Sequence, residues 1–322
     1  MKLSTLSVSF LTMAGLTSTL PVDASTVSCS AGLTTHSAQF ESAIQYDDEQ
    51  NKANPTVNVL VNGKVAKMLL DTGSSLNLLW DPSLLDGTPG TPGAPSERMD
   101  YHVASADARR VEAELADGRG HAWREAFYLV ADSALAAEGY AGILSPQAVA
   151  GQNAVVIDFE RNCFFTSAPF DVKSVKGVQI GRGKNIRNPL ALMVIHVKFD
   201  GRDVPLLVDS GAASTMILDS LIASKPKGAQ APRMMDVSGA EIPKANQMRL
   251  LDFQVNGLTF KAHPVIPVPP APQQGVPEAG VIGMDVLKDR ILYYDGIRQE
   301  FDLLTRRPVA KYTVVEPQTR EQ

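Results

Sequence analysis

The fold is decided by VNGKVAKMLLDTGSS at residues 61–75 and by FDGRDVPLLVDSGAA at residues 199–213. Each stretch contains Asn-Gly or Asp-Gly, then an apolar run, and then Asp-(Thr/Ser)-Gly. Asn-Gly and Asp-Gly are preferred in two-residue hairpin turns. Each stretch is therefore expected to form two strands joined by a tight turn, with an aspartate at the end of the second strand.

The two stretches belong to an internal repeat. The interval from Asp71 to Asp209 equals the interval from Gly142 of AGIL to Gly280 of AGVI. A third pair of segments, VIDF and YYDG, begins at positions 156 and 293 and departs from that interval by a single position. Three landmarks in register predict a chain built from two copies of one unit.

The composition favours a soluble, turn-rich β protein and excludes several classes of function. The chain has 24 Gly and 21 Pro, a formal net charge of −5 and a pI of about 5.6. An acidic chain lacks the basic face that nucleic acid requires. Beyond the N-terminus, no apolar run approaches the ~18 residues of a membrane span. The five histidines form no H-E-x-x-H motif and the two cysteines lie far apart, so we expect no metal and no cofactor.

The repeat and the composition together predict an all-β, bilobal organisation. The expected parts are a signal peptide at 1–24, an N-terminal segment at 25–55, an N-terminal lobe at 56–165, an inter-lobe linker at 166–189, a C-terminal lobe at 190–304 and a polar tail at 305–322. Phe40–Tyr46 and Val175–Ile180 occupy equivalent places before the two lobes. We expect both segments to be strands of a sheet that the lobes share.

The N-terminus has the pattern of an export signal. Lys2 is followed by an apolar stretch from Leu6 to Leu20 and by Val22-Asp23-Ala24, a small-residue cleavage pattern. The protein is therefore expected to be periplasmic or secreted after cleavage behind Ala24. The alternative is a lipoprotein anchored at Cys29, although Thr26 stands where a lipobox has leucine. Export also permits a disulfide between Cys29 and Cys163.

The two motifs carry a resemblance to a known family. Asp71-Thr72-Gly73-Ser74-Ser75 and Asp209-Ser210-Gly211-Ala212, each followed at the same interval by an apolar-apolar-(Gly/Ser) turn, resemble the pepsin-like and retropepsin-like aspartic peptidases, of the bacterial type with both motifs in one chain. The resemblance implies a cleft between two β lobes, with Asp71 and Asp209 on facing loops. It also implies that Thr72 and Ser210 brace the two loops against each other. Gly73 and Gly211 are expected to allow tight turns beneath the aspartates.

Two adjacent carboxyl groups suit metal-free hydrolysis of a peptide bond. They cannot both ionise cheaply, so they share one proton, and one acts as a base while the other acts as an acid. The sequence therefore predicts an aspartic endopeptidase that takes a peptide or protein substrate and needs no second chain. In the family, the hydroxyl at Ser74 donates to the adjacent aspartate, and Ala212 has no such hydroxyl. Asp71 is therefore expected to be the more acidic of the two, with the proton on Asp209.

A hairpin between the first aspartate and Gly142 is the candidate for the family's flap. Its tip is Asp117-Gly118-Arg119-Gly120, between strands at 111–115 and 123–130. In the second lobe, the matching hairpin is expected at 235–239 followed by 248–255.

Two other functions compete with the peptidase. A non-catalytic peptide-binding or inhibitor protein could use the same scaffold. Such proteins commonly lose one aspartate or its glycine, and this sequence keeps both motifs. A serine hydrolase is disfavoured because the sequence contains no G-x-S-x-G.

Overall fold

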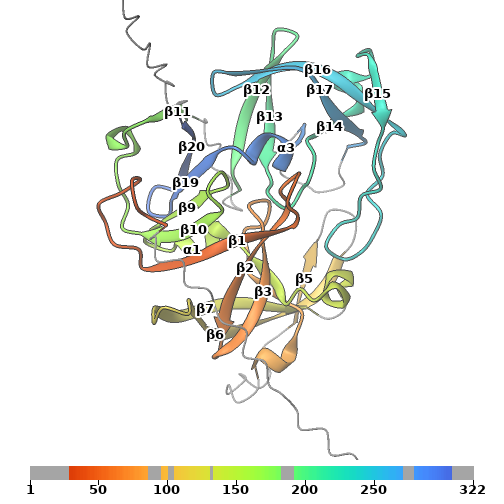
Figure 1. Cartoon of the computed structure of the whole chain (residues 1–322). Coiled ribbons are helices and arrows are strands. Elements are labelled where there is room, and N and C mark those ends of the chain that lie inside the picture. The colour runs from red at the N-terminus through yellow and green to blue at the C-terminus, as the bar shows by residue number, and fades with distance from the viewer. Residues whose placement is uncertain are drawn as a thin grey trace, which may run out of the picture.

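The computed structural model describes residues 29–85, 96–100, 105–130, 133–182, 192–270 and 279–306, and these form two β lobes (Figure 1). The helices described are short: α1 (Pro146–Ala150), α2 (Asp219–Ile222), α3 (Met284–Leu287) and the 3₁₀ turns η1 (Pro82–Leu85), η2 (Ala134–Glu138) and η3 (Val172–Ser174). The predicted all-β, bilobal fold is confirmed. The predicted signal peptide and most of the polar tail lie outside the described residues.

The two lobes contain matching sets of strands. Lobe 1 has β2 (Ala53–Val61), β3 (Lys64–Leu70), β4 (Leu78–Leu79), β5 (Ser96–Asp100), β6 (Ser105–Ala116), β7 (Ala122–Val130) and β8 (Gly142–Leu144). Lobe 2 has β12 (Val194–Phe199), β13 (Arg202–Val208), β14 (Met216–Leu218), β15 (Lys227–Gln230), β16 (Gln247–Val255), β17 (Leu258–Val268) and β18 (Gly280–Ile282).

The turns that open the two copies have the conformation that their sequences predict. Asn62 and Gly63 have φ angles of 49° and 76°, and Asp200 and Gly201 have φ angles of 51° and 71°. Two successive residues with positive φ form the mirror-image turn that matches the twist of a hairpin. Each turn therefore sends its apolar strand, β3 or β13, back through the lobe to the aspartate at its end.

The strand pairings repeat with the interval found in the sequence. Leu70 pairs in parallel with Leu144, and Val208 pairs in parallel with Ile282. The antiparallel pairing of β8 with β4 in lobe 1 likewise corresponds to the antiparallel pairing of β18 with β14 in lobe 2. Every partner in lobe 2 follows its counterpart by the interval that separates Asp209 from Asp71, so the repeat in the sequence is a repeat of the fold.

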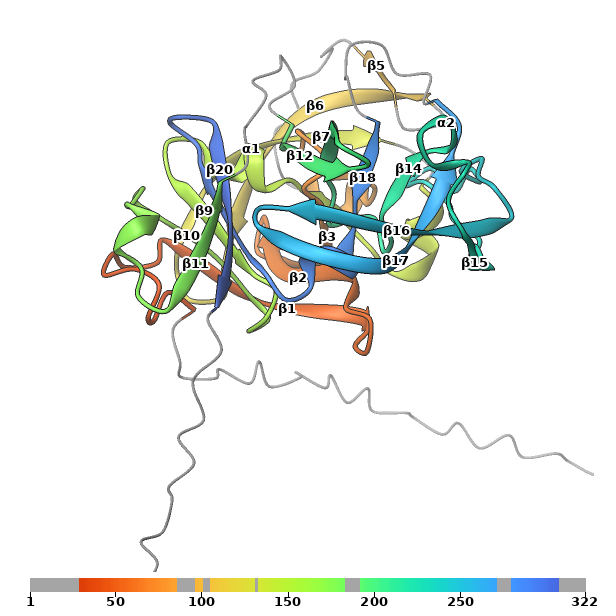
Figure 2. The same cartoon turned by 90° about the horizontal axis from the view of Figure 1, so that it is seen from above.

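A sheet joins the two lobes (Figure 2). Its strands lie in the order β11-β20-β19-β9-β10-β1. They are β1 (Phe40–Asp48), β9 (Ala154–Asp158), β10 (Cys163–Ser167), β11 (Val178–Arg182), β19 (Ile291–Asp295) and β20 (Glu300–Arg306). The antiparallel contact of β9 with β19 crosses between the two halves of the chain. The prediction that the segments before each lobe contribute strands to a shared sheet is confirmed.

A buried ion pair reinforces this sheet. Arg306, in the last strand, contacts the carboxylate of Asp158, which is almost fully buried, and it also reaches Glu160 at 2.9 Å. The expected boundary of the polar tail was placed at residue 305, whereas β20 continues to Arg306. The two extra residues belong to the sheet because Thr305 and Arg306 pair with β11.

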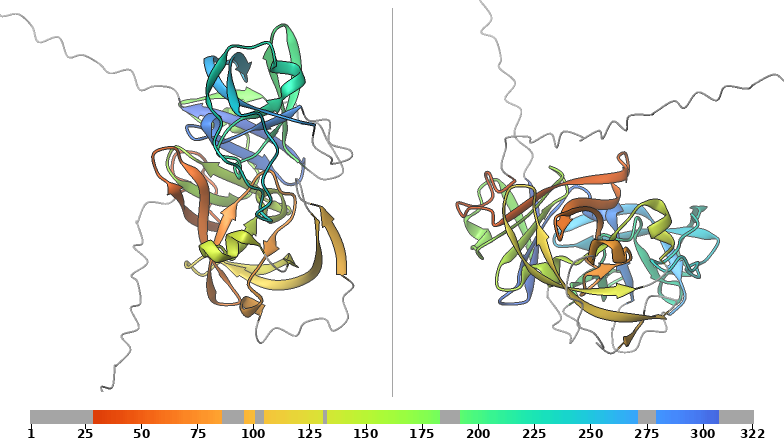
Figure 3. Two further views of the ribbon diagram at one scale, coloured as in Figure 1. Left: turned by 90° about the vertical axis from the view of Figure 1, so that its right-hand side faces the viewer. Right: turned by 90° about the horizontal axis from the view of Figure 1, so that it is seen from below.

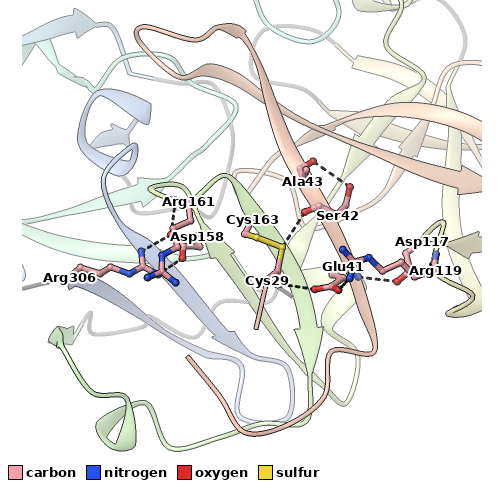
Figure 4. The surroundings of a disulfide bond; sticks show 10 residues. All are labelled: Cys29, Glu41, Ser42, Ala43, Asp117, Arg119, Asp158, Arg161, Cys163 and Arg306. Atoms are coloured by element: carbon pink, nitrogen blue, oxygen red, sulfur yellow. Dashed lines mark hydrogen bonds and ion pairs between the residues drawn. A yellow bond between two sulfur atoms is a disulfide. The ribbon is translucent and has the colours of Figure 1, made fainter. Parts of the chain in front are cut away.

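A disulfide attaches the N-terminal segment to the same sheet. Cys29 and Cys163 are bonded, with their Cα atoms 5.6 Å apart (Figure 4). Cys163 opens β10, so the bond covers one end of the shared sheet with the segment before β1.

The predicted second-lobe hairpin is wrong. The strand β16 forms its hairpin with β17, through a turn at Asn256-Gly257 where both φ angles are positive. Residues 235–239 instead form a separate turn, closed by a single bridge between Met235 and Glu241.

Candidate active site

The two sequence-predicted aspartates come together between the lobes. Asp71 follows β3 and Asp209 follows β13, and the backbone amide of each donates to the strand beside it, at Leu144 and Ile282. The two carboxyl groups share a hydrogen bond. Asp71 is buried, whereas Asp209 keeps partial exposure, so solvent reaches one side of the pair.

Thr72 and Ser210 bind the two loops to each other. The Thr72 hydroxyl donates to the carbonyl of Val208 at 2.8 Å and accepts from the amide of Ser210 at 2.9 Å. The Ser210 hydroxyl donates to the carbonyl of Leu70 at 2.6 Å and accepts from the amide of Thr72 at 3.0 Å. Both residues are fully buried, so these bonds between the loops are shielded from competition with water.

Gly73 and Gly211 have a different role from the one expected. Neither has a positive φ, so the turn itself does not require glycine. A Cβ atom at Gly73 would instead lie 2.7 Å from the carboxyl carbon of Asp209, and one at Gly211 would lie 3.0 Å from that of Asp71. Each glycine therefore leaves the space that the aspartate of the opposite lobe occupies.

Protonation of the pair is asymmetric. Burial raises the pKa of Asp71, and the amide of Gly73, 2.7 Å from Oδ1, and the hydrogen bond from Asp209 oppose that rise. Burial, the charge of Asp71 and the bond between the carboxyls raise the pKa of Asp209 well above its ordinary value. The pKa of Asp209 is therefore raised more than that of Asp71, which favours the proton on Asp209.

The expected cause of this asymmetry, the hydroxyl of Ser74, is wrong. The hydroxyl of Ser74 donates to the carbonyl of Leu76 at 2.8 Å and accepts from the Leu76 amide, so its bonds turn away from Asp71. The backbone amide of Ser74, and not its hydroxyl, supports Asp71. The amides of Gly211 and Ala212 support Asp209 in the same way, so the difference between the aspartates arises chiefly from the charge of Asp71 and the bond between the carboxyls, which raise the pKa of Asp209.

Comparisons with known proteins agree with the fold. Residues 195–286 match the model of a family described as aspartyl protease. Among solved structures, the chain is similar to an aspartic proteinase from Irpex lacteus, with 13% identity and a TM-score of 0.51, over 83% of this chain and 97% of that one. A comparison with curated protein sequences gives no match.

The chain resembles the aspartic peptidase family. At 13% identity the structural similarity establishes the bilobal aspartic-peptidase fold and nothing finer. The roles of individual residues rest on their geometry in this chain.

The predicted flap at Asp117–Gly120 lies in the wrong place. Ala116 pairs with Leu60, and Leu60 pairs with Val65 at the start of β3, so about six residues of strand, or roughly 20 Å, separate the tip from Asp71. The tip instead contacts β1, where Asp117 accepts from the amide of Glu41 and Arg119 pairs with the Glu41 carboxylate (Figure 4). Asp117–Gly120 therefore anchors lobe 1 beside the disulfide.

The hairpin of β5 and β6 lies much closer to the aspartates. Met99 and Ala106 in this hairpin pack against a cluster that contains Leu69 and Ile143, two residues from Asp71 and from Ser145 respectively. In Figure 1, β5 stands on the side of lobe 1 that faces lobe 2. The tip of this hairpin, at 101–104, lies outside the described residues.

A loop of lobe 2, residues 234–242, reaches across to lobe 1. The Ser133 hydroxyl donates to the carbonyl of Val237 at 2.6 Å, and Val237 packs against the same lobe-1 cluster as Met99. Val237 follows Met99 by the interval of the repeat, so this loop is the counterpart of the β5–β6 hairpin. The left view of Figure 3 shows it extending between the lobes.

The sequence reasoning missed the polar side chains that support the aspartate loops from behind. In lobe 1, Gln147 donates to the carbonyl of Thr72 at 2.7 Å, and the hydroxyl of Ser145 donates to the carbonyl of Ser74 at 2.6 Å. In lobe 2, Asp285 holds Thr215. Asp285 follows Gln147 by the interval of the repeat, so the repeat could have located this position.

Neither a metal-binding cluster nor a membrane-spanning helix is found in the described part of the chain. There, no group of three or more His, Cys, Asp or Glu side chains could hold a metal ion. Across the same residues, no helix is long and apolar enough to cross a bilayer.

Proposed function

We propose that this chain is an aspartic endopeptidase that hydrolyses peptide bonds with Asp71 and Asp209. The observation that carries the proposal is the placement of the two carboxyl groups side by side, each against the glycine of the opposite loop, because two adjacent carboxyls that share one proton provide a base and an acid at the same pH. Both aspartates come from one chain, so a monomer contains the whole pair. The hydrogen bonds of Thr72 and Ser210 hold the two carboxyls in position before any substrate binds.

In the proposed reaction each aspartate has its own role. The Asp71 carboxylate removes a proton from a water molecule on the exposed side of the pair, and the water oxygen attacks the peptide carbonyl carbon. Asp209 gives its proton to the carbonyl oxygen, which yields a tetrahedral diol. On breakdown, Asp71 passes its proton to the leaving nitrogen, Asp209 recovers a proton from the diol, and the carbon–nitrogen bond breaks.

Variants of the aspartates test the proposal. Asp71→Asn and Asp209→Asn should each abolish cleavage of a mixed peptide library, because each removes one member of the pair with little change in volume. Asp219→Asn makes the same chemical change at an exposed position in lobe 2 and should leave turnover unchanged. A transition-state analogue of the statine type should inhibit the native chain, and a metal chelator should not.

Each outcome has a clear reading. Near-normal turnover in either aspartate variant would reject the assignment of that residue. Peptide binding without cleavage by the native chain would favour a non-catalytic binding protein on the same scaffold.

We also propose that the protein acts outside the cytoplasm. The apolar N-terminal stretch and the bond between Cys29 and Cys163 both suit an exported protein. The first residue of the mature chain should then be Ser25, which sequencing of the exported protein can check. Retention of Met1 in the mature protein would contradict the proposal.

A further inference from the structure

A polar cluster lies behind the loop that carries Asp209. It consists of Thr215, six residues after Asp209, His263 in β17 and Asp285 in α3. The Asp285 carboxylate accepts from the hydroxyl of Thr215 at 2.8 Å and from its amide at 3.0 Å. The Nε2 atom of His263 lies 2.9 Å from the same carboxylate. Asp285 therefore bonds to Thr215 at two atoms and also contacts the imidazole of His263.

The start of α3 holds the same loop through its backbone. The amide of Met284 donates to the carbonyl of Ala212 at 2.8 Å, and the amide of Gly283 donates to the hydroxyl of Thr215 at 3.3 Å. The Ala212 amide, in turn, donates to the Asp209 carboxyl at 3.2 Å, beside the Gly211 amide at 2.9 Å. The position of residues 212–215 thus decides where the amides that bond to Asp209 lie.

The corresponding place in lobe 1 is built differently. Gln147 occupies the position of Asp285, but its neutral amide reaches the Thr72 carbonyl directly. Glu125 occupies the position of His263 and bonds to its own neighbour, Trp123, at 2.9 Å. The carboxylate–imidazole pair is therefore specific to the lobe that carries Asp209.

We propose that Asp285 is a positioning residue for the reaction, which fixes Asp209 through Thr215 and the loop 212–215, with His263 orienting the Asp285 carboxylate. This inference rests on the proposed peptidase function. The Asp285 carboxylate bonds to Thr215 and His263 rather than to either catalytic aspartate, so its loss should act on the alignment of the carboxyl pair and not on substrate binding.

The variant Asp285→Asn tests this role. It replaces one acceptor oxygen by an NH₂ group, which faces the donors of Thr215 or His263 and leaves one of them unpaired. We expect kcat to fall about 10- to 100-fold, as for other sub-ångström misplacements of catalytic groups, with KM within about twofold of the native value. Titration with a tight-binding transition-state analogue gives the concentration of active sites. Because kcat is then expressed per active site, a variant that is partly unfolded does not show a falsely low kcat.

Substitutions of the other two residues extend the test. Thr215→Val removes only the hydroxyl, and it should lower kcat in the same way even if Asp285→Asn folds poorly. His263→Gln keeps a donor for Asp285 and should retain more activity per site than His263→Leu. The exposed change Asp219→Asn is the control and should have no effect.

A readout that does not need turnover separates this inference from the proposed function. The amides of Gly211 and Ala212 lower the pKa of Asp209, so displacing the loop should raise it further. NMR titration of labelled aspartate carboxyls should therefore show an upward shift of the higher apparent pKa of the pair in Asp285→Asn.

An unchanged titration and an unchanged kcat per site in Asp285→Asn and Thr215→Val would overturn the positioning role. If the native chain cleaves no peptide, the proposed function fails, and the titration alone then decides whether Asp285 positions Asp209.

Discussion

Replacing Gly73 by alanine should misalign the two aspartates without disturbing the turn that holds them. The backbone at Gly73 is accessible to any residue, because its φ is not positive. The added Cβ would lie 2.7 Å from the Asp209 carboxyl carbon and 2.8 Å and 3.0 Å from its oxygens. The methyl group and the carboxyl must therefore move apart.

The size of this movement follows from the contact distances. Non-bonded carbon atoms approach comfortably to about 3.5 Å, so Asp209 and Gly73→Ala must separate by ~0.8 Å. For Gly211→Ala, where the Cβ would lie 3.0 Å from the Asp71 carboxyl carbon, the separation is ~0.5 Å. Since a displacement of about 1 Å costs about 10²-fold in rate, we expect kcat to fall about 40-fold in Gly73→Ala and about tenfold in Gly211→Ala.

The pH dependence should change in a defined direction. The charge of Asp71 helps to hold the pKa of Asp209 high, so moving the two apart should lower it. The alkaline limb of the pH–rate profile, which reports loss of the Asp209 proton, should then shift to lower pH in Gly73→Ala.

The assay is steady-state cleavage of one peptide substrate across pH, with active sites counted by inhibitor titration. Gly118→Ala is the control, because its Cβ would meet no atom within 4 Å and its φ is not positive. That variant should be fully active, as expected for a hairpin tip remote from Asp71. Activity of Gly73→Ala within about threefold of native, or a larger loss in Gly211→Ala than in Gly73→Ala, would refute the reasoning.

Three other changes test separate features. Ser74→Ala should leave the pH–rate profile unchanged, because the hydroxyl bonds to a backbone carbonyl and not to Asp71; a shifted acidic limb would contradict this. Arg306→Met should lower the free energy of unfolding by about 3 kcal/mol in urea titrations, because it leaves Asp158 buried without its cation. Asp209→Asn should raise stability at neutral pH. Because the pKa of Asp209 is raised in the folded protein, its protonated form contributes to the free energy of unfolding. This contribution is full below about pH 4 and is lost as pH rises through the folded pKa, so the stability advantage of the variant should vanish near pH 4 in urea titrations.

Much of the fold could be predicted from the sequence because the deciding signals are local and occur twice. The turns at Asn62-Gly63 and Asp200-Gly201 depend on backbone preferences of the residues themselves. The segments around Gly142 and Gly280 follow the two aspartates at the same interval, which indicates that they have equivalent places in the two lobes. A repeated pattern constrains the fold more strongly than a single motif, since both copies must bury their apolar strands in the same way.

The flap could not be placed in the same way. The sequence identified the hairpin of β6 and β7 but not which end of β3 its tip would approach. That end depends on the pairing of Ala116 with Leu60, a contact between residues far apart in the chain. In lobe 2, for the same reason, the sequence predicted a hairpin at residues 235–239, whereas the hairpin turn lies at Asn256-Gly257.

The sequence by itself determined which residues are the candidates for the chemistry, and the tertiary structure decided how they are held. Asp71 and Asp209 were recognisable because each ends an apolar strand within the same repeated frame. Their asymmetry, the need for glycine at 73 and the support from Asp285 all depend on which atoms of one lobe lie within about 3 to 4 Å of the other or of the aspartate loops. Such distances arise only when the strands have paired and the lobes have packed, so no local pattern of residues contains them.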